Sequence, residues 1–333
     1  MSQAIEQTRV LVSGCGSIGK RHIANLQALG LSAITAVDPD KSACMEAERK
    51  LGVRIAVSFE EALRERPDIV VVASPNHVHM EQALQAAKVG ADLFIEKPLS
   101  HEMTGVNELL TYVEQNRLVG MVGCNMRFHP AISKIKEVLS EQKLGKVYSV
   151  QAEFGFYLPW WRPGKDYREN YGARKRTGGG VILDAIHEID ALWWFFGPVR
   201  QAMTLSQKQS DLEIETEDVA EISLRFANGV LGHIHLDYLN RHYARNLKII
   251  GKQGTLEWDW NQEFIRIFRE GDSPAEEYAV PARENPNEMY RDEMRHFLSC
   301  VAERKTTICP IEDAAEVLSV AMSAKRSSEM VPQ

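Results

Sequence analysis

The sequence predicts an α/β protein of two domains. Residues 1–125 are expected to form a doubly wound parallel sheet, and residues 126–333 an α+β domain with a large open, mostly antiparallel sheet. Two observations support this division. Short apolar runs with helix-like stretches between them fill the first part, whereas alternating apolar and polar residues dominate the second. The 333 residues provide enough chain for two hydrophobic cores.

The first part contains the strand signals of a sheet that is buried on both faces. Helix-like segments lie between these runs, and one of them, His77–Val89, ends at Gly90 as a helix C-terminus should. Ser58 and Glu61 have the spacing of a capping box, which predicts a short helix that ends before Pro67. The predicted strands are Val10–Ser13, Ile34–Val37, Ile69–Ala73, Leu93–Ile95 and Leu118–Gly123.

The second part begins with a predicted helix, Ala131–Leu139, and continues with strands that alternate in polarity. The tripeptide "ANG" at 227–229 and "GKQG" at 251–254 have the composition of hairpin turns. Two amphipathic helices, near 288–303 and 311–328, are expected at the end of the chain. The predicted strands are Val147–Phe156, Ala220–Phe226, Val230–Leu236, Leu247–Ile250, Thr255–Trp258 and Phe264–Phe268.

The composition is that of an ordinary soluble protein, and the cysteines discussed below predict a cytoplasmic location. A net charge of −7 argues against nucleic acid as a partner, and no apolar run approaches the roughly 20 residues of a membrane span. The first ten residues, "MSQAIEQTRV", lack the layout of a signal peptide. The five cysteines are odd in number and have no metal-like spacing, so we expect reduced thiols and no bound metal.

A glycine motif follows the first predicted strand. In "VLVSGCGSIGKRH", Gly14, Gly16 and Gly19 have the G-x-G-x-x-G spacing of a dinucleotide-binding Rossmann domain. Ser17 and Ile18 then lie in the first helical turn, whose free N–H groups bind a pyrophosphate. Asp38 ends the second strand, where a carboxylate accepts hydrogen bonds from ribose hydroxyls and repels a 2′-phosphate. The sequence therefore predicts NAD rather than NADP; a ligand-free tight turn is the alternative.

A second loop of the predicted cofactor site is "ASPNHVH" at 73–79. Pro75 ends a strand after Ser74, and Asn76 can cap the following helix. His77 and His79 fall near the carboxyl edge of the sheet, where ligands bind in such folds. No third metal ligand is near in sequence, so we interpret the loop as part of the cofactor site rather than a metal site.

The stretch "FIEKPLS", residues 94–100, ends a buried strand in Glu96 and Lys97. Pro98 disfavours helix at Lys97 and keeps it extended. One interpretation is a solvated charge pair. The other is a lysine aimed at a ligand, with Glu96 neutralising or orienting its ammonium, which stabilises a developing alkoxide and relays its proton. We favour the second, because of the motifs elsewhere in the chain.

The segment "GGGVILDAIHEIDALWWFFG", residues 178–197, predicts an apolar helix after three glycines that leave an open approach. Asp184, His187 and Asp190 recur at intervals of three and are expected on one helical face. A carboxylate beside an imidazole fixes its tautomer and raises its basicity, as a general base requires. A buried histidine satisfied by its own helix is the structural alternative, and zinc lacks a convincing ligand set.

These motifs together resemble the Gfo/Idh/MocA oxidoreductase family over essentially the whole chain. The resemblance rests on G-x-G-x-x-G, S-P-N-x-x-H, E-K-P and G-G-G-x-x-x-D with a following H-x-x-D, in this order. It implies hydride transfer between a nicotinamide and a sugar, cyclitol or sugar derivative. It also implies Lys97, Asp184 and His187 as catalytic residues, and a homodimer or homotetramer formed through the C-terminal sheet.

One departure from the family pattern concerns this helix. Many members place the histidine four residues after the aspartate, but here the gap is three, so Asp190 is an alternative partner for His187. Sequences with the shorter gap resemble the branch found with bacterial surface-polysaccharide and nonulosonate biosynthesis. The positions expected to contact the substrate, besides the catalytic three, are Asn125, Arg127, Trp161, Arg162 and Arg168.

A basic, aromatic loop precedes the glycines. Between Trp160 and Arg176 it carries six basic and two acidic side chains, with tyrosines between them. Arginine forks bind carboxylate or phosphate, so Arg162, Arg168 and Arg174 are candidates for holding an anionic substrate. An oligomer interface or a solvated loop is the alternative. Two further functions stay open beside the dehydrogenase: an epimerase or lyase that recycles tightly bound NAD, and a non-catalytic NAD sensor.

Overall fold

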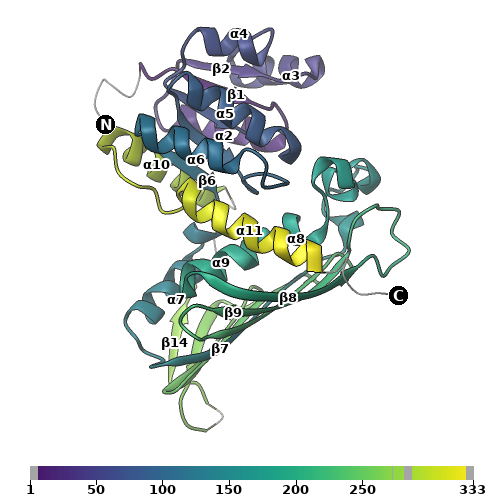
Figure 1. Ribbon diagram of the computed structural model, residues 1–333, viewed down its shortest axis with the longest axis vertical. Coiled ribbons are helices and arrows are strands. Elements are labelled where there is room, and N and C mark those ends of the chain that lie inside the picture. Colours follow the sequence, from purple (N-terminus) through teal and green to yellow (C-terminus); the bar gives the residue numbers. More distant parts are fainter. Residues whose placement is uncertain (1–6, 272, 281–286, 328–333) are drawn as a thin grey trace. The chain divides into compact units, whose positions relative to one another are not determined.

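The computed structural model describes residues 7–271, 273–280 and 287–327, and Figure 1 shows their secondary structure. Predictions on residues 1–6 and 328 lie outside these residues. Two compact units form. The first contains residues 1–125 and 285–315, and the second contains residues 126–284 and 316–333. The segment 285–315 thus returns to the first unit, which the predicted division at residue 125 did not include. Each unit is described below by itself.

The sheet of the first unit has six parallel strands in the order β3-β2-β1-β4-β5-β6 among the described residues. Residues of β1, β4, β5 and β6 are buried along their whole length, which shows that both faces are covered. The order reverses between β1 and β4, the place where ligands bind in doubly wound sheets. The strands are β1 Val10–Ser13, β2 Ile34–Val37, β3 Arg54–Ile55, β4 Ile69–Val72, β5 Asp92–Glu96 and β6 Gly120–Gly123.

Helices connect these strands as the sequence predicts. In α4 the backbone N–H of Glu61 donates to Ser58 Oγ at 3.1 Å, so the predicted N-cap is present. Helix α10, which belongs to the returning segment, packs on α2. The helices of this unit are α2 Ser17–Ala28, α3 Lys41–Leu51, α4 Phe59–Arg64, α5 His79–Lys88, α6 Val106–Asn116 and α10 Glu288–Glu303, and α11 Ile311–Ser327 starts in it.

The sheet of the second unit has eight described strands in the order β14-β13-β12-β11-β7-β10-β9-β8. Only the pair β7 with β10 is parallel among these strands. The strands are β7 Val147–Gly155, β8 Val199–Gln207, β9 Val219–Phe226, β10 Leu231–Asp237, β11 Ala244–Gly251, β12 Gly254–Asp259, β13 Phe264–Phe268 and β14 Glu276–Ala279.

Helices cover one face of this sheet, and the other face is open (Figure 1). Side chains alternate between the two faces; in β9, for example, buried and partly exposed residues follow each other along the strand. The helices are α7 Pro130–Ser140, α8 Val181–Asp184 and α9 Ile186–Phe196. The structure therefore confirms the predicted α/β class, with a parallel sheet in one unit and a mostly antiparallel sheet in the other.

Three strands were not predicted. Strand β3 has only two residues, too short for a periodic signal. Strand β8 lies at the edge and exposes Met203 and Leu205 on its outer face, which obscures the expected alternation. Strand β14 is short and highly charged. Among the described residues, every helix is too short or too polar to span a lipid bilayer.

Candidate active site

Glycine is needed at the three motif positions for different physical reasons. A Cβ at Gly14 would lie 2.4 Å from the carbonyl oxygen of Ala73, and a Cβ at Gly19 would lie 1.8 Å from that of Gly14. Both glycines are therefore required by the packing of the protein itself. At Gly16 no atom lies within 4 Å of the corresponding Cβ position. The space beside Gly16 is what a ligand approaching the backbone needs.

The N-terminus of α2 is suited to an anion. Gly16 is its N-cap and provides no side-chain cap, and the first turn, which starts at Ser17 and Ile18, contains no acidic residue. The backbone N–H groups at the start of a helix have no partner within the helix and carry partial positive charge. Together with the space at Gly16, this arrangement fits the pyrophosphate of a dinucleotide.

Asp38 is fixed beside this loop. Its Oδ2 accepts from the backbone N–H of Cys15 at 2.7 Å, and its Oδ1 accepts from that of Asp40 at 2.8 Å. The thiol of Cys44 donates to the Asp38 carbonyl at 3.3 Å. Burial, with the neighbouring Cys44 and Asp38, raises the pKa of Cys15 to about 12, so this thiol stays protonated. The carboxylate is held at the end of β2, where the sequence predicts a contact with ribose.

The buried imidazole of His79 contacts the backbone of the loop Ser74–His79. His79 is fully buried, and its ring nitrogens lie 2.8 Å from the carbonyl oxygen of Ser74 and 2.9 Å from that of Pro98. Burial lowers the pKa of this imidazole, against the two carbonyls that raise it. His79 thus links two loops through their backbones, and it has no surface for the ligand contact that the sequence predicts.

Asn76 lies on the short 3-10 helix Asn76–Val78 that follows Pro75. The sequence suggested that Asn76 could cap the following helix, but its side chain caps neither that helix nor α5. Its side chain is 4% exposed, and within the part of the chain that the structure describes its Nδ2 has no hydrogen-bond partner. A buried amide donor of this kind is costly unless a ligand satisfies it. Asn76 therefore fits the predicted cofactor site.

Glu96 has a partner that the sequence does not predict, His22. Its Oε1 lies 2.5 Å from Nε2 of His22, whose ring is fully buried, and its Oε2 accepts from the backbone N–H of Lys97 at 3.2 Å. Burial opposes ionisation, but His22 and the nearby cations hold the pKa of Glu96 below its usual value. The Lys97 ammonium also lowers the pKa of Glu96, so the predicted neutralisation of Lys97 by Glu96 stays a prediction. Glu96 anchors the end of β5, and the Lys97–Pro98 peptide bond is cis.

In the second unit, the segment 178–197 is not one helix. Helix α8 ends at Asp184, Ala185 leaves helical geometry, and α9 begins at Ile186. The expectation that Asp184 and His187 share one helical face through a spacing of three is therefore wrong, because the face does not continue through the break. His187 and Asp190 do lie on one helix, α9.

Asp184 is held by two tyrosine hydroxyls. Tyr171 donates to its Oδ1, and Tyr238 donates to its Oδ2 at 3.1 Å. Burial and the nearby Asp184 raise the pKa of Tyr238 well above its ordinary value, so this hydroxyl remains a donor. A Cβ at Gly172 would lie 3.0 Å from Asp184 Oδ2, so the loop residue at this position has to be small. The carboxylate is buried and precisely oriented by side chains remote in sequence.

Asp190 is occupied by Arg127. The guanidinium donates to both carboxylate oxygens, at 2.7 and 3.0 Å, and the two side chains are 1% and 0% exposed. This buried pair does not agree with a substrate contact by Arg127, nor with Asp190 as the orienting partner of His187. Asn125 is also buried, at the start of the short 3-10 helix Asn125–Phe128.

The glycines at 178–180 do not provide an open approach to Asp184. A Cβ at Gly179 would lie 2.4 Å from the carbonyl oxygen of Gly172, and one at Gly180 would lie 2.1 Å from Glu217 Oε1. Gly180 also has φ +109°. The role of these glycines is close packing, which brings the 171–172 loop against the start of α8.

Two arginines of the basic loop have different surroundings. Arg168 is engaged by Asp166 and by Glu213, the latter at 2.7 Å, which disfavours its expected contact with substrate. Arg162 instead lies over the ring of Tyr171, 5.8 Å from its centroid. Trp161 donates to the Phe156 carbonyl at 3.0 Å and meets Tyr238 edge to face at 5.3 Å.

The family models match both units. Residues 8–124 match the model "Oxidoreductase family, NAD-binding Rossmann fold", and residues 132–257 match "GFO/IDH/MocA C-terminal domain". The chain belongs to the Gfo/Idh/MocA oxidoreductase family. It is an oxidoreductase with an NAD-binding Rossmann domain, as the glycine motif and E-K-P predicted.

Relatives of known name agree with this family. The chain is 28% identical to myo-inositol 2-dehydrogenase of Thermotoga maritima, with 96% of each chain covered. Its fold is similar to that of levoglucosan dehydrogenase in complex with NADH, with TM-score 0.85, 20% identity, and 98% and 99% coverage. It is equally similar to the WlbA dehydrogenase of Bordetella pertussis in complex with NADH and UDP-GlcNAcA, with TM-score 0.84, 20% identity, and 98% and 99% coverage.

Sequence reasoning missed three partners in this family member. Tyr238 follows β10 and is 54 residues from Asp184, so no local pattern connects them. Tyr171 is one of the tyrosines of the basic loop, and no local pattern distinguishes it from the others. His22 is 74 residues from Glu96. A basic residue on the first helix is common, and only the tertiary fold shows that this one is buried.

Proposed function

We propose that this protein is an NAD-dependent dehydrogenase or reductase that interconverts a hydroxyl and a keto group on a sugar, sugar acid or nucleotide sugar. The space beside Gly16 at an uncapped helix N-terminus carries the cofactor part of the proposal. The names of the relatives support a polyhydroxylated substrate, because inositol and levoglucosan are both rings bearing hydroxyl groups.

The cofactor is held by the first unit. The α2 N-terminus binds the pyrophosphate, Asp38 accepts from the adenosine ribose hydroxyls, and the Nδ2 of Asn76 donates to the dinucleotide. The fixed Asp38 carboxylate disfavours a 2′-phosphate, so NADP binds more weakly. Bound NAD supplies hydride acceptance, which leaves the chain itself to move the proton of the substrate hydroxyl.

The acid–base residues come from both units. Lys97 stabilises the oxygen of the reacting group and relays its proton, and His187 takes that proton as general base. Asp184, fixed by Tyr171 and Tyr238, binds a substrate hydroxyl or orients the imidazole. Removing a positioned acid or base costs about a hundredfold or more in rate.

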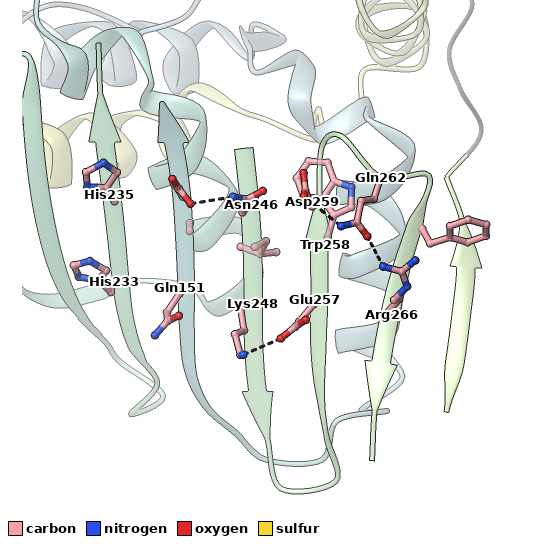
Figure 2. Close-up of a pocket in the computed structure, with 14 residues that line it drawn as sticks. Gln151, His233, His235, Asn246, Lys248, Glu257, Trp258, Asp259, Gln262 and Arg266 are labelled. Carbon is pink, nitrogen blue, oxygen red and sulfur yellow. Dashed lines mark hydrogen bonds and ion pairs between the residues drawn. The ribbon is translucent and has the colours of Figure 1, made fainter. Parts of the chain in front are cut away.

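The open sheet face supports an oligomer. Met203, Leu205 and Leu231 are 63%, 69% and 50% exposed on the face opposite the helices. Figure 2 shows the polar part of the same face, where Lys248 pairs with Glu257 at 2.8 Å. We propose that a second copy covers this face in a homodimer or homotetramer. The five buried cysteines, which form no disulfide, support a cytoplasmic location.

The test is NADH formation by the full chain with NAD⁺ against myo-inositol, levoglucosan, glucose, glucuronate and UDP-N-acetylglucosamine. We expect a rise in NADH fluorescence with at least one of them, and loss of the signal in Lys97→Ala. Substrate turnover without net NADH, with NAD retained through purification, would show an epimerase or lyase instead. NAD binding without turnover of any member would contradict the dehydrogenase.

A further inference from the structure

A pocket of about 420 Å³ lies in the basic loop of the second unit. It is separate from the open sheet face, whose groove is lined by strand residues (Figure 2). Its walls combine two aromatic side chains, two cations, two carboxylates and one amide. The side chains that matter here are Trp161, Arg162, Lys165, Asp166, Glu169 and Asn170.

Asn170 is the deepest polar group of the pocket. It is 9% exposed, and its Oδ1 is buried with no hydrogen-bond partner among residues 7–271, 273–280 and 287–327. Its backbone is already satisfied, since its N–H donates to the Tyr167 carbonyl at 3.0 Å. A buried acceptor left unsatisfied is costly, so this amide indicates a ligand that offers an O–H or N–H donor.

The cations that line the pocket differ from the nearby Arg168 in having no ion-pair partner among the described residues. Arg168, which does not line the pocket, is engaged by Asp166 and Glu213. Arg162 and Lys165 line the pocket, and the described part of the chain offers neither an ion pair. With Asp166 neutralised by Arg168, these two cations face only Glu169. Among the described lining residues, two cations and one carboxylate are therefore left without an ion pair.

The pocket adjoins the tyrosines that hold Asp184. Its wall residue Trp161 meets Tyr238 edge to face at 5.3 Å, and the Arg162 guanidinium lies over Tyr171 at 5.8 Å. Both tyrosines donate to Asp184. One side chain, Tyr171 or Tyr238, thus lies between these wall residues and Asp184.

We propose that this pocket is an anion subsite of the substrate site. Arg162 and Lys165 bind a carboxylate or phosphate of the substrate, and Asn170 accepts from a neighbouring hydroxyl or amide. The ion-paired Arg168 has no part in it. The inference rests on the proposed function in one respect, namely that the ligand is a sugar derivative. It selects the anionic sugars, sugar acids or sugar phosphates, from that broader class.

Binding to the NAD-loaded full chain tests this subsite without turnover. The probes are glucuronate for a carboxylate, uridine diphosphate for a phosphate, and glucose as the neutral control. Calorimetry measures the dissociation constant of each. We expect at least one anion to bind, with glucose at least tenfold weaker. Charge-assisted hydrogen bonds are the strong ones, so Arg162→Gln and Lys165→Gln should each weaken the anion about tenfold or more.

Two further variants complete the experiment. Arg176→Gln makes the same charge change on an exposed residue outside the pocket and should leave affinity within about twofold. Asn170→Ala should weaken glucuronate severalfold and leave inorganic phosphate unchanged, because phosphate alone does not need the amide. Thermal unfolding of each variant shows whether it is folded.

The subsite is wrong if glucose binds as tightly as both anions, or if Arg176→Gln weakens them as much as Arg162→Gln does. Binding that survives in the folded double variant of Arg162 and Lys165 also overturns it. These outcomes do not depend on NADH formation. A neutral sugar that is oxidised would leave the dehydrogenase intact and overturn only the subsite, whereas anion binding without turnover would do the reverse.

Discussion

The two units obtain their functional residues in different ways. In the first, Gly14, Gly16 and Gly19 fall within six residues of one another, and the local turn they form creates the anion site at the start of α2. In the second, Asp184 depends on Tyr171 and Tyr238, which come from a loop and from the end of a strand. A cofactor site built on one strand–turn–helix unit is therefore visible in sequence, whereas an acid–base site assembled across a sheet is not.

The same contrast appears in how each unit uses buried charge. Glu96 and His22 fix the end of β5 just before Lys97. Arg127 and Asp190 form a buried pair on the helical side of the second sheet. In both units a buried ionic contact lies next to a candidate catalytic residue, so support and chemistry are separate tasks carried by neighbouring side chains.

The largest effect is expected at Lys97. Lys97→Ala should reduce kcat about 10²- to 10⁴-fold, because it removes positioned acid–base and electrostatic help. The NADH dissociation constant should change little, since the glycine loop and Asp38 are intact. Steady-state kinetics with a substrate found in the panel, together with NADH titration, measures both. A variant that keeps most of its kcat would make Lys97 the solvated end of a strand.

Of the two carboxylates of the second unit, Asp190 should matter for stability and Asp184 for the reaction. Asp190→Ala leaves the buried Arg127 guanidinium without its carboxylate, which costs about 3–5 kcal/mol of folding free energy. Asp184→Asn keeps the shape beside Tyr238 and should lower kcat with a smaller effect on folding. Urea unfolding and kinetics on both variants test this. A stable Asp190→Ala that has lost turnover would reverse the two roles.

Much of the fold could be predicted because its signals are local. Strands β1 and β2 have the predicted bounds, Val10–Ser13 and Ile34–Val37, and helix α10 also matches. The edge strand β8 was missed, because a strand with exposed apolar residues has no clear inward face. The return of residues 285–315 to the first unit was also missed, since amphipathic periodicity does not say which sheet a helix will cover.

The site was predictable to the extent that residue identity fixed the local backbone. Gly16 and Asp38 follow from the spacing of one motif. The break at Ala185 does not, because nothing in "LDAIHE" forbids a continuous helix. The engagement of Asp190 by Arg127 is a contact between residues 63 apart.

A substitution at Asp38 tests the proposed cofactor site, and we expect an effect of intermediate size on the preference for NAD over NADP. Asp38→Ser removes the charge that faces a 2′-phosphate, so the preference for NAD over NADP should fall about 10- to 100-fold, mainly by tighter NADP binding. Dissociation constants for NADH and NADPH, measured on the wild type and the variant, show the change. Equal affinities in the wild type would contradict the role of Asp38.

The smallest effect concerns His235 on the open face. Hydrogen bonds with Asp237 and Glu221 raise its pKa to about 9 from an ordinary 6.5. A raised pKa means that the imidazolium stabilises the fold fully below pH 6.5 and that this contribution is lost as the pH rises through about 9. Because the ring is 33% exposed, solvent reduces the effect to about 1–2 kcal/mol.

Urea unfolding at pH 6.5 and pH 9 measures this loss. In His235→Gln the difference between the two pH values should shrink, whereas His233→Gln, which changes a more exposed ring on the same Glu221, should keep it. An unchanged pH dependence in His235→Gln would show that the cluster contributes nothing to stability.

NADH affinity tests most directly the claim that the first unit alone carries the cofactor site. Gly16 is the motif glycine with open space beside it, so the Cβ of Gly16→Val meets no protein atom and its side chain occupies the volume that the pyrophosphate needs. We predict that Gly16→Val stays folded and loses NADH binding at least a hundredfold, while Asp184→Asn binds NADH as the wild type does. Wild-type affinity in Gly16→Val, or lost affinity in a folded Asp184→Asn, would contradict this account.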